Sequence, residues 1–223
     1  MIILLLLLVA AAILGPSWWV RRTIAKYAQP DDRYPGSGAE LARHLLDRHG
    51  LGAVKVTRGE PNTDHYNPVT RTVNLSPQCH DGRSLTAITI AAHEVGHALQ
   101  HRDGDRMLAM RSRIALLHAT GQLVIVPLVL LAPVLGLTLR APALMWGLIA
   151  MAFLVQALGT VLHLVTLPVE WDASFGRALP LLEQERILHA GDAPHARRLL
   201  RAAAFTYVAG SLFSLLLLVR WIR

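Results

Sequence analysis

Residues 84–101 read SLTAITIAAHEVGHALQH, and this stretch decides the fold that we expect around it. Ser84 can cap the start of a helix, because a serine hydroxyl accepts a hydrogen bond from the first helical turn. Beyond it, apolar residues recur with the spacing of one helix face, at Leu85, Ile88, Ala92, Val95 and Leu99. The same helix places His93 and His97 four residues apart on another face, so their side chains are neighbours.

The pattern His93-Glu94-Val95-Gly96-His97 indicates a zinc site. Two histidines at this spacing can direct ring nitrogens to one cation at ~2.0–2.1 Å. Glu94 is then beside the Zn²⁺ without ligating it, and can act as general base toward water in peptide hydrolysis. Gly96 costs about 1 kcal/mol relative to alanine in mid-helix, which indicates that another backbone approaches closely there.

A third metal ligand must come from another part of the chain. His101 lies about 12 Å from His93 at the helical rise of ~1.5 Å per residue, so both cannot bind one ion, and we expect His101 to be solvated. Glu170 is the better candidate, because it directly follows an apolar stretch ending near Pro168, where an ionisable group suggests a function. Weaker candidates, expected in loops or near apolar segments, are His65, His80, His118 and His163.

Charged residues are absent from four long windows, residues 1–20, 114–139, 141–169 and 202–219. Each window is about as long as the ~20 residues with which a helix crosses a lipid bilayer. Because 53% of the residues are hydrophobic and only 17% are charged, a soluble protein is a poor fit. The sequence therefore predicts a mainly α membrane protein with four transmembrane helices and a small α+β zincin-like domain.

The net charge of +7 does not predict a nucleic-acid partner, because the basic residues gather beside the apolar windows. This distribution follows the positive-inside rule, with clusters at Arg21, Arg22 and Lys26, at Arg111 and Arg113, and at Arg197, Arg198 and Arg201. We therefore expect a multi-pass protein of the bacterial cytoplasmic membrane with its N-terminus outside and its catalytic domain in the cytoplasm. The first window lacks a leading positive charge, which favours an uncleaved anchor over a signal peptide.

The polar segment between the first two windows has its own pattern. Residues 37–40, Ser-Gly-Ala-Glu, form a capping box for a helix that ends near Gly50. Alternating β-branched residues predict strands at 54–57 and 70–75, with a loop at 59–68 between them. The predicted order is helix, two strands, metal-binding helix. A single cysteine, Cys79, excludes an internal disulfide and is expected to be a packed side chain.

These patterns predict five segments along the chain. They are an N-terminal transmembrane anchor at 1–20, a cytoplasmic α+β metallopeptidase domain at 21–113, a transmembrane hairpin at 114–168, a cytoplasmic amphipathic segment carrying Glu170 at 169–201, and a C-terminal transmembrane helix at 202–223.

The chain resembles the YugP-like neutral zinc metallopeptidases of bacterial membranes. The resemblance rests on several motifs spread along the sequence, including Thr63-Asp64-His65-Tyr66-Asn67-Pro68, Ala91-Ala92-His93-Glu94-Val95-Gly96-His97-Ala98 and Pro168-Val169-Glu170-Trp171-Asp172-Ala173-Ser174. It implies a multi-pass zinc peptidase acting on a peptide or membrane-protein substrate, and leaves the identity of the substrate and the oligomeric state open.

The segment around Glu170 is also similar to the third-ligand helix of HtpX-like membrane peptidases. It departs from that pattern at Ser174, where the family has aspartate, and Asp172 is a weak candidate to orient a histidine instead. Two further hypotheses concern the substrate. Residues 64–66 would supply a donor that stabilises an oxyanion, and the strand at 70–75 would pair with an extended peptide.

Two other functions fit parts of the sequence. Residues 91–99 also resemble the motif of site-2-type intramembrane proteases, but the apolar run there is shorter than a membrane span. The Asp103-Gly104 pair, which would have to supply the third ligand, follows too closely to reach His93. A non-catalytic membrane scaffold with a structural zinc is the second alternative, although such a protein would not need Glu94.

Overall fold

The computed structural model describes residue 15, residues 18–138 and residues 140–205. The described residues form two compact units. The first contains the chain up to Asp105 and again from Pro168 onward, and the second contains Arg106 to Leu167.

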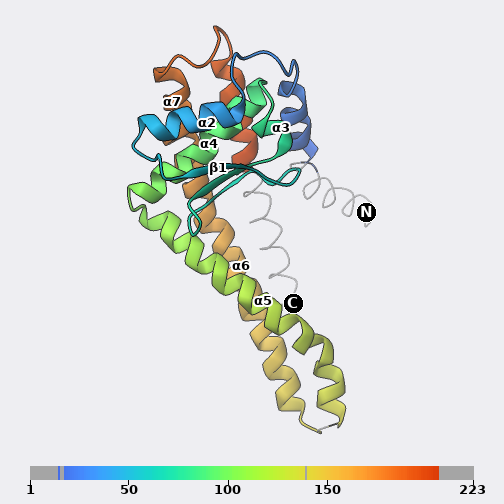
Figure 1. Cartoon of the computed structure of the whole chain (residues 1–223). Coiled ribbons are helices and arrows are strands. Elements are labelled where there is room, and N and C mark those ends of the chain that lie inside the picture. The colour runs from blue at the N-terminus through green and yellow to red at the C-terminus, as the bar shows by residue number, and fades with distance from the viewer. Residues whose placement is uncertain (1–14, 16–17, 139, 206–223) are drawn as a thin grey trace. The chain divides into compact units, whose positions relative to one another are not determined.

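The first unit is an α+β domain, as the sequence predicts (Figure 1). Its sheet has the order β1-β3-β2, in which β3 runs parallel to β1 and antiparallel to β2. The elements up to the metal-binding helix are α2 (Gly38–Arg48), β1 (Lys55–Arg58), β2 (His65–Asn67), β3 (Thr72–Leu75), α3 (Pro77–His80) and α4 (Leu85–Arg102).

The strand β2 lies within residues 59–68, where the sequence predicts a loop, so that prediction is wrong. A three-residue strand in which only Tyr66 favours β structure gives little local signal, and the strand exists because Tyr66 pairs with Val73 and buries its ring. The hypothesis that residues 70–75 bind an extended peptide is wrong, because β3 lies in the middle of the sheet and both of its edges are already paired.

The predicted helix caps are confirmed. The Ser37 hydroxyl accepts the backbone N–H of Glu40, and the Glu40 carboxylate accepts the backbone N–H of Ser37. The hydroxyl of Ser84 accepts the N–H of Ala87 at 3.2 Å, which fixes the start of α4. Gly50 follows the end of α2 with a φ of +72°, a left-handed conformation that glycine adopts without steric cost.

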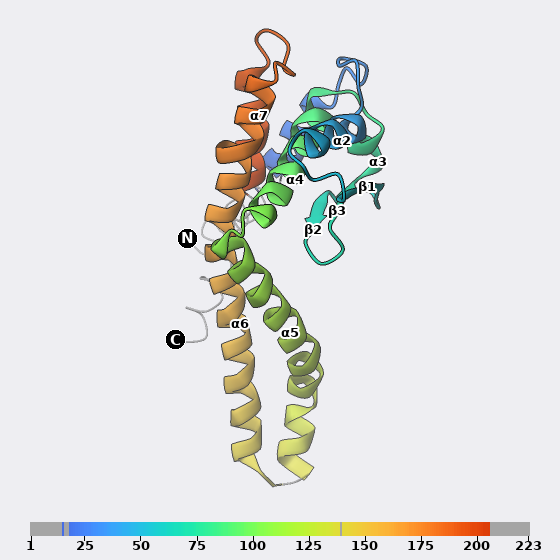
Figure 2. The same cartoon turned by 60° about the vertical axis from the view of Figure 1, so that its left-hand side comes forward.

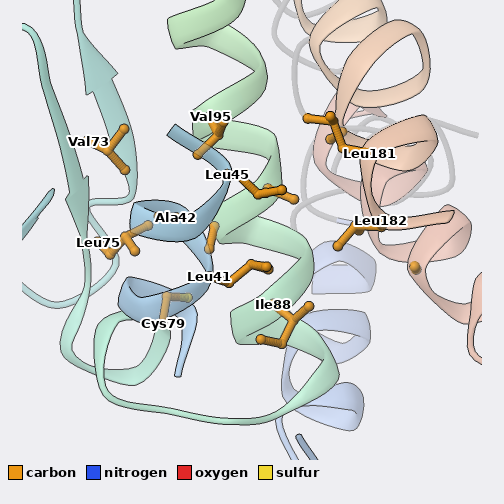
Figure 3. Packing of buried hydrophobic residues seen from close by; sticks show 14 of the residues in the cluster. Leu41, Ala42, Leu45, Val73, Leu75, Cys79, Ile88, Val95, Leu181 and Leu182 are labelled. Atoms are coloured by element: carbon orange, nitrogen blue, oxygen red, sulfur yellow. The ribbon is translucent and has the colours of Figure 1, made fainter. Parts of the chain in front are cut away.

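The core of this unit surrounds α4. Figure 3 shows Leu41 and Leu45 of α2 on one side of α4 and Leu181 and Leu182 of the later helix α7 (Leu179–Gln184) on the other, with Val73 of β3 beyond. Because α4 packs against other elements on most of its faces, 15 of its 18 residues are buried, and these include both histidines of the motif. Burial on this scale fixes the orientation of the metal-binding face.

The chain returns to the first unit at Pro168, near the end of α6 (Pro142–Trp171). There follow without interruption the π-helix η1 (Asp172–Ala178) and α7 (Leu179–Gln184). Helical residues 193–205 then pack beside helical residues 18–27, where the Tyr27 hydroxyl lies 3.1 Å from His195 Nδ1. The segment from 168 onward therefore belongs to the same unit as α4, although more than sixty residues separate them.

The second unit is a helical hairpin of α5 (Arg106–Thr138) and the first part of α6, seen in Figure 2. Small residues allow the two helices to approach, since Gly121 faces Val155 and Gly136 faces Met145. By length and hydropathy, the described helices that begin at Arg106 and Pro142 can each cross a membrane. They contain residues 114–138 and 142–169 of the two central predicted windows. The windows 1–20 and 202–219 lie almost entirely outside the described residues.

Candidate metal centre

His93, His97 and Glu170 meet in the interior of the first unit. His93 Nε2 lies 3.1 Å from Glu170 Oε2, and His97 Nε2 lies 3.6 Å from Glu170 Oε1. One ligand atom from each of the three lies within 4.8 Å of the others, and all three side chains are buried. Within the part of the chain that the structure describes, no other group of histidine, cysteine and carboxylate side chains converges in this way.

The second nitrogen of each histidine is held by a neighbour. His97 Nδ1 lies 2.9 Å from Gln100 Oε1, which can only accept, so Nδ1 carries the proton and donates it. His93 Nδ1 lies 3.1 Å from the hydroxyl oxygen of Ser174. Metal-binding histidines commonly have their other nitrogen fixed in this manner, which orients the ring and selects the tautomer.

The donor set fits zinc. Two imidazole nitrogens and one carboxylate form the three-ligand arrangement of catalytic zinc sites, and a fourth position is then left for water or substrate. The Nε2 atoms of His93 and His97 both face Glu170, so an ion there would replace the contacts that the three side chains now make with one another. Among the described residues, the buried thiol of Cys79 is not one of the converging ligand atoms.

Glu94 is buried next to these groups, with 5% of its surface exposed. Burial raises the pKa of its carboxyl to about 7. The charges of Glu170 and Asp64 raise this pKa further. His93 and the backbone N–H of Tyr66 lower it.

For Glu170, which lies beyond the predicted membrane crossing, burial also favours a higher pKa. The hydrogen bonds from His93 and His97 outweigh it and hold the pKa well below its ordinary value. The two carboxyl groups are therefore suited to different roles, Glu170 as an anionic ligand and Glu94 as a group that exchanges a proton.

The close approach expected at Gly96 exists. A Cβ atom built on Gly96 would lie 2.6 Å from the backbone oxygen of Ala173 in η1. In η1 the N–H of Leu179 bonds to the oxygen of Ser174, five residues earlier, so the turn is wider than in an α-helix. Contact between Gly96 and Ala173 thus brings Ser174 to His93.

We expect Gly96→Ala to destabilise the protein by about 1–3 kcal/mol, because the added methyl group forces η1 away from α4. The same displacement should weaken zinc binding, since it moves Ser174 and Glu170 relative to the histidines. Thermal melting and a zinc titration measure the two effects. Gly147→Ala is the matched control, because a Cβ at that helical glycine meets nothing within 4 Å. Equal effects of the two substitutions would contradict this account of Gly96.

Gln100 is a residue of the site that the sequence patterns did not indicate. Its side chain is fully buried, accepts from His97 and donates its Nε2 to Asp172 Oδ2 and to the carbonyl of Val169, both at 2.9 Å. Asp172 thus contacts the metal centre through Gln100, rather than by holding a histidine itself. Gln100 lies three residues after His97 and so on the same face of α4, which is the signal that could have identified it. Ser174 lies four residues after Glu170, so the same helical spacing could have identified it.

The expectation that His101 is solvated is wrong, because its side chain is half-buried. Its Nδ1 lies 2.8 Å from the hydroxyl oxygen of Tyr66, so this contact joins β2 to the end of α4.

The weaker candidates His65 and His80 do not lie with the candidate ligands. His65 is exposed and contacts the backbone oxygen of Thr63, and His80 pairs with Asp81. The expectation for Cys79 is confirmed, since it is buried and burial raises its pKa to about 12.

A cavity of about 520 Å³ lies along the first half of α4, lined there by Ser84, Thr86 and Ile90. Ile90, one turn before Glu94, forms part of its wall together with Asp64 and Cys79. The charge of Asp64 raises the pKa of Glu94, and the charge of Glu94 raises that of Cys79, so the cavity lies within electrostatic range of the Glu94 carboxyl.

Comparisons with known proteins agree with this chemistry. A family model described as "Putative neutral zinc metallopeptidase" matches residues 1–223. The chain is 37% identical over 219 residues to a protein of Bacillus subtilis (strain 168) named "Putative membrane protease YugP", and the match covers 95% of this chain and 92% of that protein. No solved structure matches the chain. The chain therefore belongs to the YugP-like family of neutral zinc metallopeptidases.

Proposed function

We propose that the protein is a membrane-bound zinc endopeptidase. In this proposal His93, His97 and Glu170 hold one Zn²⁺ ion and Glu94 is the general base. The observation that carries it is the convergence of these three ligand atoms within 4.8 Å beside a buried glutamate. Burying a carboxylate and two imidazoles together is costly, and a cation held by all three would offset that cost.

A bound zinc ion supplies a Lewis acid that polarises a peptide carbonyl and lowers the pKa of water. The protein's own residues do the rest. Glu94 accepts the proton of the attacking water and passes it to the nitrogen of the leaving amine. Ser174 and Gln100 keep the histidine rings in place through Nδ1. The side chains of α2, α7 and the sheet exclude bulk water from the buried face of α4, which strengthens electrostatic interactions in the site.

The cavity along the first half of α4, which Ile90 lines one turn before Glu94, supports a peptide as the substrate class. Its walls combine apolar residues, such as Ile24 and Ile90, with polar residues, such as Asp64 and Asn62. Such a lining accommodates side chains of mixed character next to a scissile bond. We propose that substrate side chains enter this cavity while the scissile bond lies over the metal centre.

We also propose that the site faces the cytoplasm at the surface of a bacterial membrane. The support comes from the positive charges that flank the apolar windows. Two crossings, one by each helix of the hairpin, return the chain to the side from which it left, so Glu170 and the histidines can meet there. Their proximity in one unit is consistent with that arrangement.

The intramembrane alternative is less well supported. A site-2-type protease needs its motif helix within the bilayer, and α4 is not among the described helices that are long and apolar enough to cross a membrane. It packs inside an α+β domain, against α2, η1 and the sheet.

The proposed activity is tested by assaying the full-length protein in detergent for cleavage of casein and of a membrane protein. We expect cleavage to stop when zinc is removed with 1,10-phenanthroline and to resume when Zn²⁺ is added back. Cleavage that survives complete zinc removal would exclude the proposed reaction. A protein that binds zinc stoichiometrically yet never cleaves would favour the scaffold alternative.

A further inference from the structure

A second cavity in the first unit is lined by basic residues and shares none of them with the metal centre. Its volume is about 370 Å³. The described residues that line it are Trp19, Ala193, Pro194, Arg197, Arg198 and Arg201. Three of these six carry a positive charge and none carries a negative one, so the cavity is suited to an anion.

The position of the cavity follows from a pair of packed helices. The rings of Trp19 and Phe205 meet edge to face at 5.9 Å, while Tyr27 contacts His195. Residues 18–27 and 193–205 therefore run in opposite directions, with Trp19 and Phe205 at one end. In sequence, the apolar window 1–20 leads into that end and the apolar window 202–219 continues from it. Trp19 and Arg201 thus line the cavity toward the end from which both predicted crossings depart, and Ala193 and Pro194 line it toward the other end.

The arginines of this cavity are poorly neutralised. Arg197 lies 3.8 Å from Glu183, but both side chains are about half exposed, and such a pair contributes little. Arg198 donates to the neutral hydroxyl of Tyr27 at 3.4 Å. Within the described residues no carboxylate pairs with Arg198 or Arg201. Arg197 and Arg201 also stand one helical turn apart, where like charges repel. A bound anion would remove this repulsion.

We propose that this cavity binds the phosphate group of an anionic phospholipid. Guanidinium groups match the geometry of phosphate oxygens and can bind them with two parallel hydrogen bonds. Tryptophan is favoured at the depth of lipid head groups. Basic pockets between membrane helices recognise anionic head groups in the same way. The lipid holds helices 18–27 and 193–205 together at the membrane surface, and this role does not depend on peptidase activity.

Lipid binding to the full-length protein is measured by native mass spectrometry. The probes are phosphatidylglycerol, phosphatidylcholine with the same acyl chains, and glycerol 1-phosphate, which has the phosphate without the chains. We expect phosphatidylglycerol to bind at least about tenfold more tightly than either of the others. Arg198→Gln with Arg201→Gln should lower its affinity about tenfold, because two charge-assisted hydrogen-bonding groups are lost.

The matched control removes two exposed arginines from the start of α5, Arg106→Gln with Arg113→Gln. It changes the net charge equally and should shift the affinity less than about twofold. If both double variants lose affinity equally, diffuse surface charge explains the binding and the proposal is wrong. Glycerol 1-phosphate that binds as tightly as the lipid would show a site for free phosphate instead. Should the Arg198/Arg201 variant fail to fold, Arg201→Gln alone replaces it, and unchanged affinity in that variant contradicts the proposal.

Discussion

Replacing Glu94 with glutamine is expected to lower the rate of peptide hydrolysis by about 10²–10⁴-fold while zinc remains bound. Glutamine has nearly the shape of glutamate, so the packing of α4 is retained, but its amide cannot accept a proton. Glu94 is not among the converging ligand atoms, so the metal should not be lost with it. Zinc content by mass spectrometry and the cleavage rate of a fluorogenic peptide, measured on the same sample, separate the two effects.

Glu60→Gln is the matched control for this variant. Glu60 is exposed in the loop between β1 and β2, and the same chemical change there should leave the cleavage rate within about twofold of the wild-type rate. Full activity of the Glu94→Gln protein would remove this residue from the mechanism. Loss of zinc together with activity would instead assign Glu94 a structural or ligating role.

Replacing Glu170 with alanine is expected to weaken zinc binding at least about 100-fold. Loss of a residue that only orients a metal ligand typically lowers metal affinity ~10–100-fold. The loss of affinity should be larger for Glu170, because it is proposed to contact the ion directly. The substitution also leaves His93 and His97 facing a small cavity in a buried site. Competition with a chromogenic chelator measures the affinity. Added zinc should raise the melting temperature of the wild-type protein but not that of the variant, because ligand binding stabilises only a protein that retains the site.

Glu183→Ala supplies the comparison for Glu170. Glu183 lies on α7 beyond η1, and its half-exposed side chain makes, within the described part of the chain, only the long contact with Arg197. Its replacement should leave zinc affinity within about twofold of the wild-type value. Unchanged affinity in the Glu170→Ala protein would mean that the third ligand lies elsewhere, and the two histidines would then need another partner.

Local sequence patterns predict much of the site. The cap at Ser84 and the apolar stripe that begins at Leu85 define α4, and the histidine spacing follows from helical geometry. Gly96 indicates the close approach of another backbone, because a mid-helix glycine lowers helix stability relative to alanine and needs such a reason. Glu170 is recognisable as an ionisable group at the end of a long apolar stretch. Each of these inferences needs only neighbouring residues.

The parts that sequence patterns could not predict depend on contacts between distant segments. Gln100 is an ordinary helical residue until Asp172 and the backbone of Val169 hold its amide. Ser174 reaches His93 only because the π-helical turn of η1 packs on Gly96. The short strand β2 likewise exists through its pairing with β3 and through the bond between Tyr66 and His101. No periodicity or composition encodes these contacts.

The account rests on one zinc ion held by two imidazoles from α4 and a carboxylate from the segment after the hairpin. A structure of the zinc-loaded protein tests this most directly. We predict a single zinc ion at ~2.0–2.2 Å from the Nε2 atoms of His93 and His97 and from a carboxylate oxygen of Glu170. An ion bound by other side chains, or Glu170 turned away from an ion that the two histidines hold, would contradict the account.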